Sequence, residues 1–268
     1  ELAARTGRIR GTGHDIVNHC INDVLVQRAY PLFFLDYLAS SKIDAEMVAE
    51  VVGGMADACA AADCVLLGGE TAEMPGVYAP GAFDIAGTLV GVAERDQLLP
   101  LNTIAAGDVL IGVASNGPHT NGYSYLRKLF AWIPMESQPV PLDRPLVEAL
   151  LEPHRNYLPV LRKALDGERV KALVHITGGG LPDNMPRVLP PGVGANIALG
   201  SWPMPPLFQL VQQLSSLDTD ELYRTLNMGV GMVIITDPAH ADQVRALIDE
   251  ETWIIGNLTS DHESVRLQ

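Results

Sequence analysis

Apolar side chains recur every three or four positions at residues 14–28 and 48–59, which predicts two amphipathic helices in the first half of the chain. Asp15 is expected in the first turn of the first helix, where a carboxylate complements the helix dipole. Short apolar runs bounded by turn residues predict strands at 31–39, 64–67, 84–93 and 108–114. This half is therefore expected to be a sheet covered by helices, of class α/β or α+β.

The second half alternates helical and extended patterns in the same style. Helices are expected at 123–130, 155–165, 181–189, 206–214, 220–226 and 239–250, and strands at 172–176, 194–199, 230–236 and 253–258. The Pro-rich residues 134–145 lack a clear period and predict a surface excursion. We place the domain boundary near 112–118, which gives an N-terminal domain of residues 1–113 and a C-terminal α/β domain of residues 114–268.

Composition and charge narrow the function classes. Of the 268 residues, 47% are hydrophobic and 19% are charged, as in a globular protein with a substantial core. The formal net charge of -14 argues against nucleic acid as a partner, because phosphate neutralisation needs clustered Lys and Arg. An anionic nucleotide would need Mg²⁺ or free backbone N–H groups at the site where it binds.

Cysteine spacing argues against disulfides and zinc sites, and hydropathy argues against a membrane-spanning segment. Three cysteines, Cys20, Cys59 and Cys64, show no paired spacing, so neither a disulfide framework nor a zinc site is indicated, and a cytoplasmic location is expected. All three fall on apolar patterns and are expected to be buried and unreactive. No apolar run is long enough to cross a bilayer, so no membrane association is expected.

The segment LLGGETAEMPGVYAP, residues 66–80, is the most distinctive motif. We expect a loop after a strand, in which Gly68 and Gly69 allow close approach of a phosphate and Glu70 offers a hard oxygen ligand to Mg²⁺. Glu73 is the weaker acidic candidate and could only brace the turn. The alternative is an ordinary tight turn with solvated acids.

Three further segments combine glycine with polar side chains. SNGPHTNGYS, residues 115–124, offers several donors to an anion between a strand and a helix, although a loop histidine is more often simply exposed. HITGGG, residues 175–180, could cradle phosphate at a helix start, or form a flexible turn. NMGVGM, residues 227–232, is better explained by close packing. Asp23 lies within the first helix, where an acid is usually solvated unless it binds a ligand.

Together with NHCINDVLVQRAYPLFFLDY, residues 18–37, these motifs resemble phosphoribosylformylglycinamidine cyclo-ligase, the aminoimidazole ribonucleotide synthetase of purine biosynthesis, over nearly the whole chain. The resemblance implies a two-domain fold in which each domain is a mixed sheet covered by helices. It implies ATP-dependent ring closure of formylglycinamidine ribonucleotide, through phosphorylation of the formyl oxygen. It also implies ATP and Mg²⁺ as cofactors, and a homodimer with the first-half sheet at its interface.

The resemblance assigns roles to particular positions. The metal ligands implied are Asp23 and Glu70. These two residues and His119 form the catalytic set. His119 is expected to contact substrate or to assist reaction at the formyl oxygen. The nucleotide contacts implied are Asn22, Asp23, Gly68, Gly69, Glu70 and Thr71. The substrate contacts implied are Ser115, His119, Thr120, Asn121, Thr177, Gly178 and Gly179.

The sequence departs from the family pattern at two places, and each departure predicts a consequence. The family has a glycine-rich DGVGTK-like segment upstream of the point where this sequence starts, so we expect further sequence there and reduced turnover without it. Arg28 stands where the family has glycine, which costs about 1 kcal/mol if that position needs positive φ. The alternatives to the cyclo-ligase are a nucleotide-binding protein without turnover and a related ATP-dependent enzyme of the same superfamily.

Overall fold

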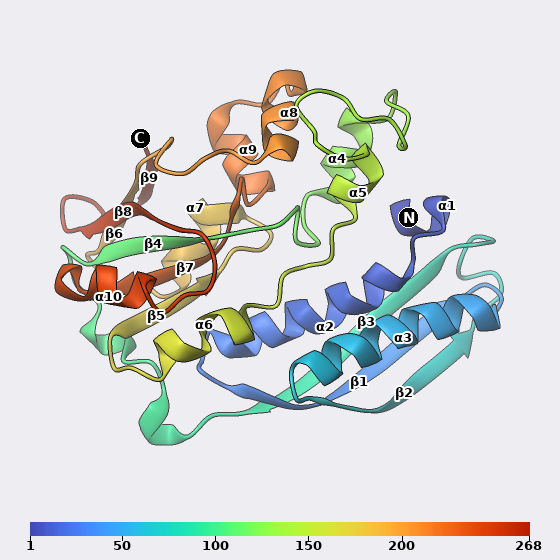
Figure 1. Cartoon of the computed structure of the whole chain (residues 1–268), viewed down its shortest axis with the longest axis horizontal. Coiled ribbons are helices and arrows are strands. Elements are labelled where there is room, and N and C mark those ends of the chain that lie inside the picture. The colour runs from blue at the N-terminus through green and yellow to red at the C-terminus, as the bar shows by residue number, and fades with distance from the viewer.

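The computed structural model describes residues 1–268 and contains two sheets with helices around them (Figure 1). The first half contains a short helix, a long helix, and three strands with a second long helix between them. Their bounds are α1 Leu2–Thr6, α2 Arg10–Leu25, β1 Tyr30–Ser40, α3 Ala45–Ala61, β2 Val65–Glu73 and β3 Phe83–Val92. No helix is both long enough and apolar enough to span a bilayer.

The second half builds a six-stranded mixed sheet of order β5-β7-β4-β8-β6-β9. Its strands are β4 Val109–Ala114, β5 Val170–His175, β6 Gly194–Ile197, β7 Val230–Thr236, β8 Thr252–Thr259 and β9 Val265–Leu267. Its helices are α4 Tyr123–Leu129, α5 Leu146–Leu150, α6 Tyr157–Leu165, α7 Gly180–Asn184, α8 Pro206–Leu214, α9 Thr219–Thr225 and α10 Ala241–Arg245. Short 3-10 turns occur at Arg95–Gln97, Leu101–Thr103, Met185–Arg187 and Pro238–His240. The expected fold of mixed sheets with helices is confirmed.

The three-stranded sheet has the order β2-β1-β3, with β1 parallel to β2 and antiparallel to β3. Helices α2 and α3 cover one face, and no helix lies over the other (Figure 1). Large apolar side chains remain exposed on these three strands, namely Leu32, Leu35, Val65, Leu67, Val90 and Val92. The sheet is therefore packed on one side only.

The expectation of a loop at the GGETAE segment is wrong, because β2 continues through it to Glu73 and pairs with β1 as far as Ser40. The register shifts by one residue just before Gly68, whose φ of 154° favours glycine. At Gly69 a Cβ would lie 2.2 Å from Asp36 Oδ1, so only glycine fits beside that carboxylate. The glycines thus allow a bulged strand to pair, rather than forming a turn.

The two halves share a continuous apolar core. One cluster contains Val17, Ile21 and Leu25 of α2 together with residues of α6 and of the six-stranded sheet, such as Leu161 and Ile234. Helix α2 therefore lies between the small sheet and α6 (Figure 1). Strand β4 pairs with β7 and β8, although the expected boundary at 113/114 placed it in the first domain. We propose that the division falls in the connection at 93–108.

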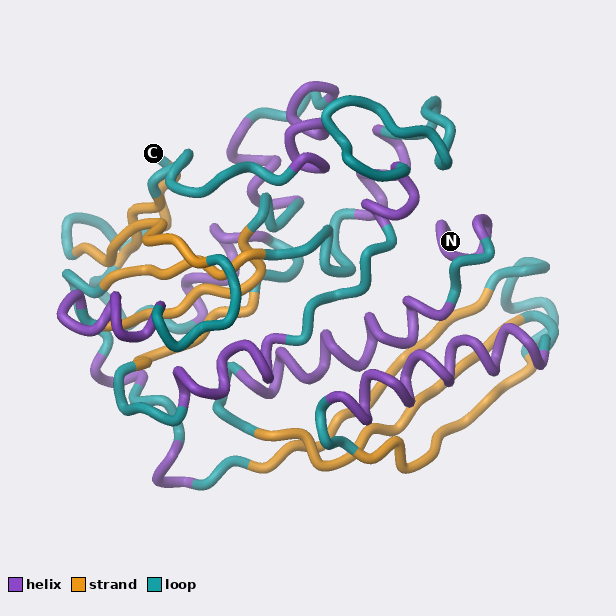
Figure 2. The backbone as a smooth tube through the Cα atoms, in the orientation of Figure 1, coloured by secondary structure: helices purple, strands orange, loops and turns teal.

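Polar side chains on one edge of α2 hold the uncoiled segment 152–156, which runs beside the helix before α6 begins (Figure 2). The backbone N–H of His154 donates to Asp15 Oδ1 at 2.8 Å, and the His154 carbonyl accepts from Asn18 at 2.7 Å. Asn22 donates to the Arg155 carbonyl and accepts from the Tyr157 N–H. The helix thereby supplies the partners that an uncoiled backbone needs when it is buried.

Local expectations were corrected at three places. Helix α2 begins at Arg10, so Asp15 lies beyond its first turn. The helix expected at 181–189 is a short α-helix followed by a 3-10 turn, because Pro186 has no N–H to continue the ladder. The helix expected at 239–250 ends at Arg245.

Arg28 does adopt the left-handed conformation that the family's glycine suggests, with φ of 55°. Its guanidinium donates to the Gln97 carbonyl at 3.1 Å. The side chain therefore gains a contact that offsets part of the backbone cost, which is about 1 kcal/mol.

We predict that Asn22→Ala lowers the free energy of unfolding by about 2–4 kcal/mol. The side chain is fully buried, and its removal leaves the Arg155 carbonyl and the Tyr157 N–H without partners. Urea denaturation followed by circular dichroism measures the change.

The matched control is Gln27→Ala just beyond the same helix, where the side chain is exposed and the expected change is within about 0.5 kcal/mol. Equal midpoints for the two variants would show that the Asn22 contacts do not stabilise the docking of α2.

Candidate active site

Four imidazoles and one carboxylate meet where α2, the loop after β4, the end of β5 and the segment 152–156 come together. The rings of His154 and His119 stack with centroids 4.3 Å apart, and His19 lies edge-on to both His154 and His175 at 5.3 Å. Asp23 is the carboxylate at the edge of this cluster. These groups come from residues far apart in sequence.

Asp23 accepts hydrogen bonds from both sides. His175 Nδ1 lies 2.8 Å from Oδ1, and His19 Nε2 lies 3.3 Å from Oδ2. Partial burial alone would raise the pKa of Asp23, but the two histidines outweigh it and hold the pKa well below its usual value. The side chain is still 54% exposed. Asp23 is therefore an ionised carboxylate that a ligand can reach.

The carboxylate also fixes the tautomers behind it. His175 donates from Nδ1 to Asp23, so its Nε2 must accept from His154 Nε2, which lies 3.1 Å away. Burial lowers the pKa of His175 and lowers that of His154 well below its usual value, so both rings are neutral. This leaves His154 Nδ1 as an acceptor, 3.4 Å from the Thr120 hydroxyl.

His119 lies beneath the loop rather than in an open site. The residue is 1% exposed, and its Nε2 is 2.6 Å from Asn116 Oδ1. Nδ1 has no partner, and burial lowers the ring's pKa well below its usual value. Backbone φ values of 51° at His119 and 63° at Thr120 form a tight turn that aims Thr120 at His19. The expected direct contact of His119 with substrate stays a prediction, and its burial favours a positioning role.

The loop that carries Thr120 is braced from below. Ser115 donates to Asn227 Oδ1 at 2.8 Å, and Asn227 donates to the Gly117 carbonyl at 2.8 Å. A Cβ at Gly231 would lie 2.2 Å from Tyr157 Oη, so close packing explains that glycine, as expected. The Ser115 hydroxyl is engaged in this bracing, and its role as a substrate contact stays a prediction.

The TGGG turn lies against the same loop. A Cβ at Gly178 would lie 3.4 Å from Asn121 Oδ1, so two of the predicted substrate motifs are neighbours. Asn184 stabilises the turn by donating to the Gly180 carbonyl at 2.8 Å and accepting from the Thr177 hydroxyl at 3.1 Å. Contacts from the Thr177, Gly178 and Gly179 positions to substrate stay predictions.

The other predicted ligand residues are not brought to this place. Gly68, Gly69, Glu70 and Thr71 lie on β2, at the edge of the three-stranded sheet, whereas Asp23 lies on α2 beside the second half. Asn22 is buried and bonded to the segment before α6. No group of three or more His, Cys, Asp or Glu side chains is arranged to hold a metal. Within one chain, Asp23 is the predicted metal ligand at the cluster.

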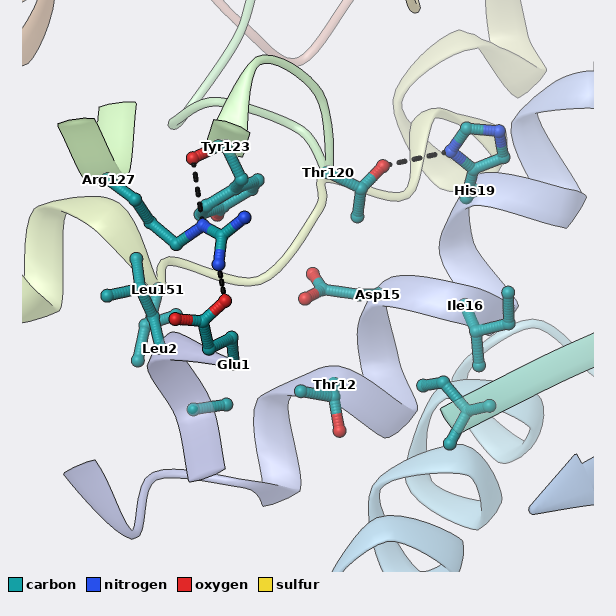
Figure 3. Close-up of a pocket in the computed structure, with 12 residues that line it drawn as sticks. Glu1, Leu2, Thr12, Asp15, Ile16, His19, Thr120, Tyr123, Arg127 and Leu151 are labelled. Atoms are coloured by element: carbon teal, nitrogen blue, oxygen red, sulfur yellow. Dashed lines mark hydrogen bonds and ion pairs between the residues drawn. The ribbon is translucent and has the colours of Figure 1, made fainter. Parts of the chain in front are cut away.

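A cavity of about 530 Å³ opens beside the cluster, between the two halves (Figure 3). Its wall contains Ile16, Ile85 and Leu151, and its polar groups come mainly from α2, the loop after β4 and α4. His19 and Thr120 line it, with Nδ1 and Oγ1 3.0 Å apart. The cavity therefore begins one helical turn from Asp23.

Of the cluster, His119 and Asp23 were predicted as site residues, whereas His19, His154 and His175, like Asp15 beside the cavity, were not. His19, His154 and Asp15 belong to no periodic pattern that marks a site, and Asp15 resembled a dipole-capping acid. His175 was visible only as the first letter of HITGGG.

The three cysteines are free, and burial raises the pKa of Cys20 to about 11 and that of Cys59 to about 12, in agreement with the expectation of unreactive thiols.

Comparisons with known proteins are consistent across the chain. The profile of the AIR synthase related protein, N-terminal domain, matches residues 4–93, and that of the C-terminal domain matches residues 105–268. The chain is 42% identical over 277 residues to the phosphoribosylformylglycinamidine cyclo-ligase of Alkaliphilus metalliredigens (strain QYMF), covering 100% of this chain and 79% of that protein. It is 46% identical over 264 residues to the enzyme of the same name from Geobacillus kaustophilus (strain HTA426), covering 96% and 76%.

Solved structures share the fold at low sequence identity. The hydrogenase maturation protein HypE of E. coli superposes with a TM-score of 0.71 at 21% identity, covering 95% of this chain and 75% of that one. Thiamine-monophosphate kinase from Stenotrophomonas maltophilia K279a gives 0.72 at 18% identity, covering 96% and 79%. These likenesses show the fold, whereas the two profiles and the relatives at 42% and 46% identity show the family. The chain belongs to the phosphoribosylformylglycinamidine cyclo-ligase family.

Proposed function

We propose that this protein closes the imidazole ring of aminoimidazole ribonucleotide. ATP phosphorylates the formyl oxygen of formylglycinamidine ribonucleotide, and a substrate nitrogen then displaces phosphate from the formyl carbon. The observation that carries the proposal is identity of 42–46% to enzymes of that name over 96–100% of the chain. No nucleophile from the protein is required.

Asp23 is the residue best suited to the nucleotide. It is ionised and half exposed, and two histidines hold it in place. Mg²⁺ is commonly bound through one or two carboxylates together with substrate phosphates, so one carboxylate at this place fits that mode. The metal would neutralise charge on the transferred phosphoryl group. An overall charge of -14 makes such local neutralisation necessary.

The surrounding residues would position the substrate. Thr120 and Asn121 lie on the braced loop next to Gly178, so they face the same region as Asp23 and His19. His119 would act from below by fixing this loop. Exclusion of water from the activated intermediate would depend on the same loop and on the apolar walls of the cavity.

We also propose a homodimer through the bare face of the three-stranded sheet. The apolar side chains exposed there, including Leu67 at 61% and Val65 at 56%, need cover. Glu70 lies on this sheet, so a role at the nucleotide would fall to the partner's Glu70. A cytoplasmic location stays a prediction, supported by three free thiols.

The activity is tested by ADP release from Mg²⁺-ATP with and without formylglycinamidine ribonucleotide, with aminoimidazole ribonucleotide measured as the product. We expect ADP release that depends on substrate and matches product in amount. A second protein extended by a family-type glycine-rich segment at its N-terminus measures what that segment adds. Failure of both proteins to form product would reject the proposed function.

We predict that Asp23→Asn raises KM for Mg²⁺-ATP at least tenfold, with kcat also reduced, because the neutral amide loses a charged ligand to the metal. Steady-state kinetics with varied ATP measure this change, and circular dichroism checks the fold. Asp249→Asn is the control, since that side chain is 86% exposed and lies apart from the site. An Asp23→Asn enzyme with wild-type KM would remove Asp23 from the metal site.

We predict that Leu67→Lys converts a dimer of twice 28.8 kDa into a monomer, because a lysine buried among the apolar side chains of this interface is costly. Light scattering coupled to gel filtration measures the mass. Val140→Lys is the matched control, because Val140 is 83% exposed but lies in the Pro-rich excursion of the second half. A monomeric wild-type protein, or a dimer in both variants, would exclude this interface.

A further inference from the structure

The cavity between the two halves contains a carboxylate without a cation. Asp15 lines it, and its carboxylate points into the open space (Figure 3). One oxygen accepts the His154 N–H at 2.8 Å, which leaves the other oxygen free of protein partners. Asp15 forms no ion pair with any Lys, Arg or His side chain, whereas Asp23 on the same helix and Asp57 on α3 each have such a partner.

The charged and titratable groups that face Asp15 do not neutralise it. His19 lies one turn further along α2, and Tyr123 and Arg127 approach from α4. Arg127 is already paired with Glu1. Burial raises the pKa of Asp15 to about 6, despite the opposing effects of the His154 N–H and of His19. The protein thus keeps a poorly solvated carboxylate that an added cation would stabilise.

The position of Asp15 on its helix relates it to the nucleotide. Asp15, His19 and Asp23 are spaced four residues apart and share one face of α2. At a rise of 1.5 Å per residue, Asp15 and Asp23 are about 12 Å apart along the helix axis. His19 and Thr120 lie between them at the mouth of the cavity. A ligand that reaches from Asp15 toward Asp23 therefore passes along this face.

We propose that Asp15 binds the amidinium group of the substrate and sets the enzyme's preference for an amidine over an amide. This inference rests on the proposed function. An amidine is a strong base and is a planar cation at neutral pH, with N–H groups that can donate to the free oxygen of the Asp15 carboxylate. In the substrate, the amidine and formyl carbons are separated by one nitrogen and one methylene. With the amidinium on Asp15, we place the formyl group on the Asp23 side of the cavity, toward the proposed nucleotide site.

The same geometry rejects the amide analogue. A formylglycinamide ribonucleotide presents a neutral group in which a carbonyl oxygen replaces one nitrogen, so it offers fewer donors and no charge. A site built around a buried polar group discriminates strongly against a ligand that leaves that group unpaired. Asp15 is thus a specificity-determining residue, separate from the metal ligand Asp23.

The test compares binding of the amidine substrate and of the amide analogue by isothermal titration calorimetry, without ATP, so that it does not depend on turnover. We expect the wild-type protein to bind the amidine at least tenfold more tightly at pH 7.5, and this preference to shrink as the pH falls below about 6 and Asp15 becomes protonated. Asp15→Asn should remove the preference, while Asp242→Asn, a change at a side chain that is 95% exposed, should retain it.

Two further readouts separate this role from a structural one. In steady-state kinetics Asp15→Asn should raise KM for the amidine at least tenfold and leave KM for Mg²⁺-ATP within twofold. Its melting temperature at pH 7.5 should exceed that of the wild type. The raised pKa means that ionisation of Asp15 between about pH 4 and 6 costs the folded state stability, and the amide can still accept from His154.

The outcomes distinguish a failure of the role of Asp15 from a failure of the proposed activity. Equal binding of amidine and amide by the wild-type protein would overturn the role of Asp15. If Asp15→Asn does not fold, the wild-type preference and its pH dependence are sufficient to test that role. Product formation with an unchanged KM in Asp15→Asn would overturn it while leaving the proposed function intact. An amidine preference that depends on Asp15, in a protein that forms no product, would support the binding role and reject only the activity.

Discussion

The structure depends on how one edge of α2 holds the uncoiled backbone before α6. Asp15, Asn18 and Asn22 satisfy the N–H and carbonyl groups of residues 154–157, and in doing so they fix the second half against the first. His19 and Asp23 follow Asp15 at four-residue spacing on the same helix. A single helix therefore both joins the two sheets and carries Asp15 and Asp23, so that any shift of α2 would move both carboxylates relative to the loop that carries Thr120.

The electrostatic character of the site follows from that burial. His119, His154 and His175 have pKa values lowered by burial and are neutral rings. Of these three, His175 contacts Asp23 directly, and together with His19 it orients the carboxylate. Asp15, at the other end of the face, is ionised only above about pH 6. Two carboxylates with different surroundings can thus take different cations, a metal with its phosphates at one end and an organic cation at the other.

Periodicity predicted the existence and type of the long elements, because α2, α3 and the central strands bury one regular face or run. It was wrong at GGETAE, where pairing with β1 outweighs the turn preference of two glycines. Asp23 was predicted as a ligand from its motif, and the structure places it at the cluster. The cluster itself was not predictable, because His19, His119, His154 and His175 are brought together by tertiary contacts that leave no local pattern. At Arg28 the sequence left the backbone conformation open, and the structure shows a left-handed residue with φ of 55°.

The core shared by α2, α6 and the six-stranded sheet limits how the enzyme can move. Hinge rotation of one half against the other would separate side chains that are fully buried, such as Ile21 and Tyr157, and would break the contacts along α2. Substrate must then enter through the open cavity between the halves, without a large change in their relative position. A catalytic cycle built this way trades large closing motions for a site that is already assembled before substrate arrives.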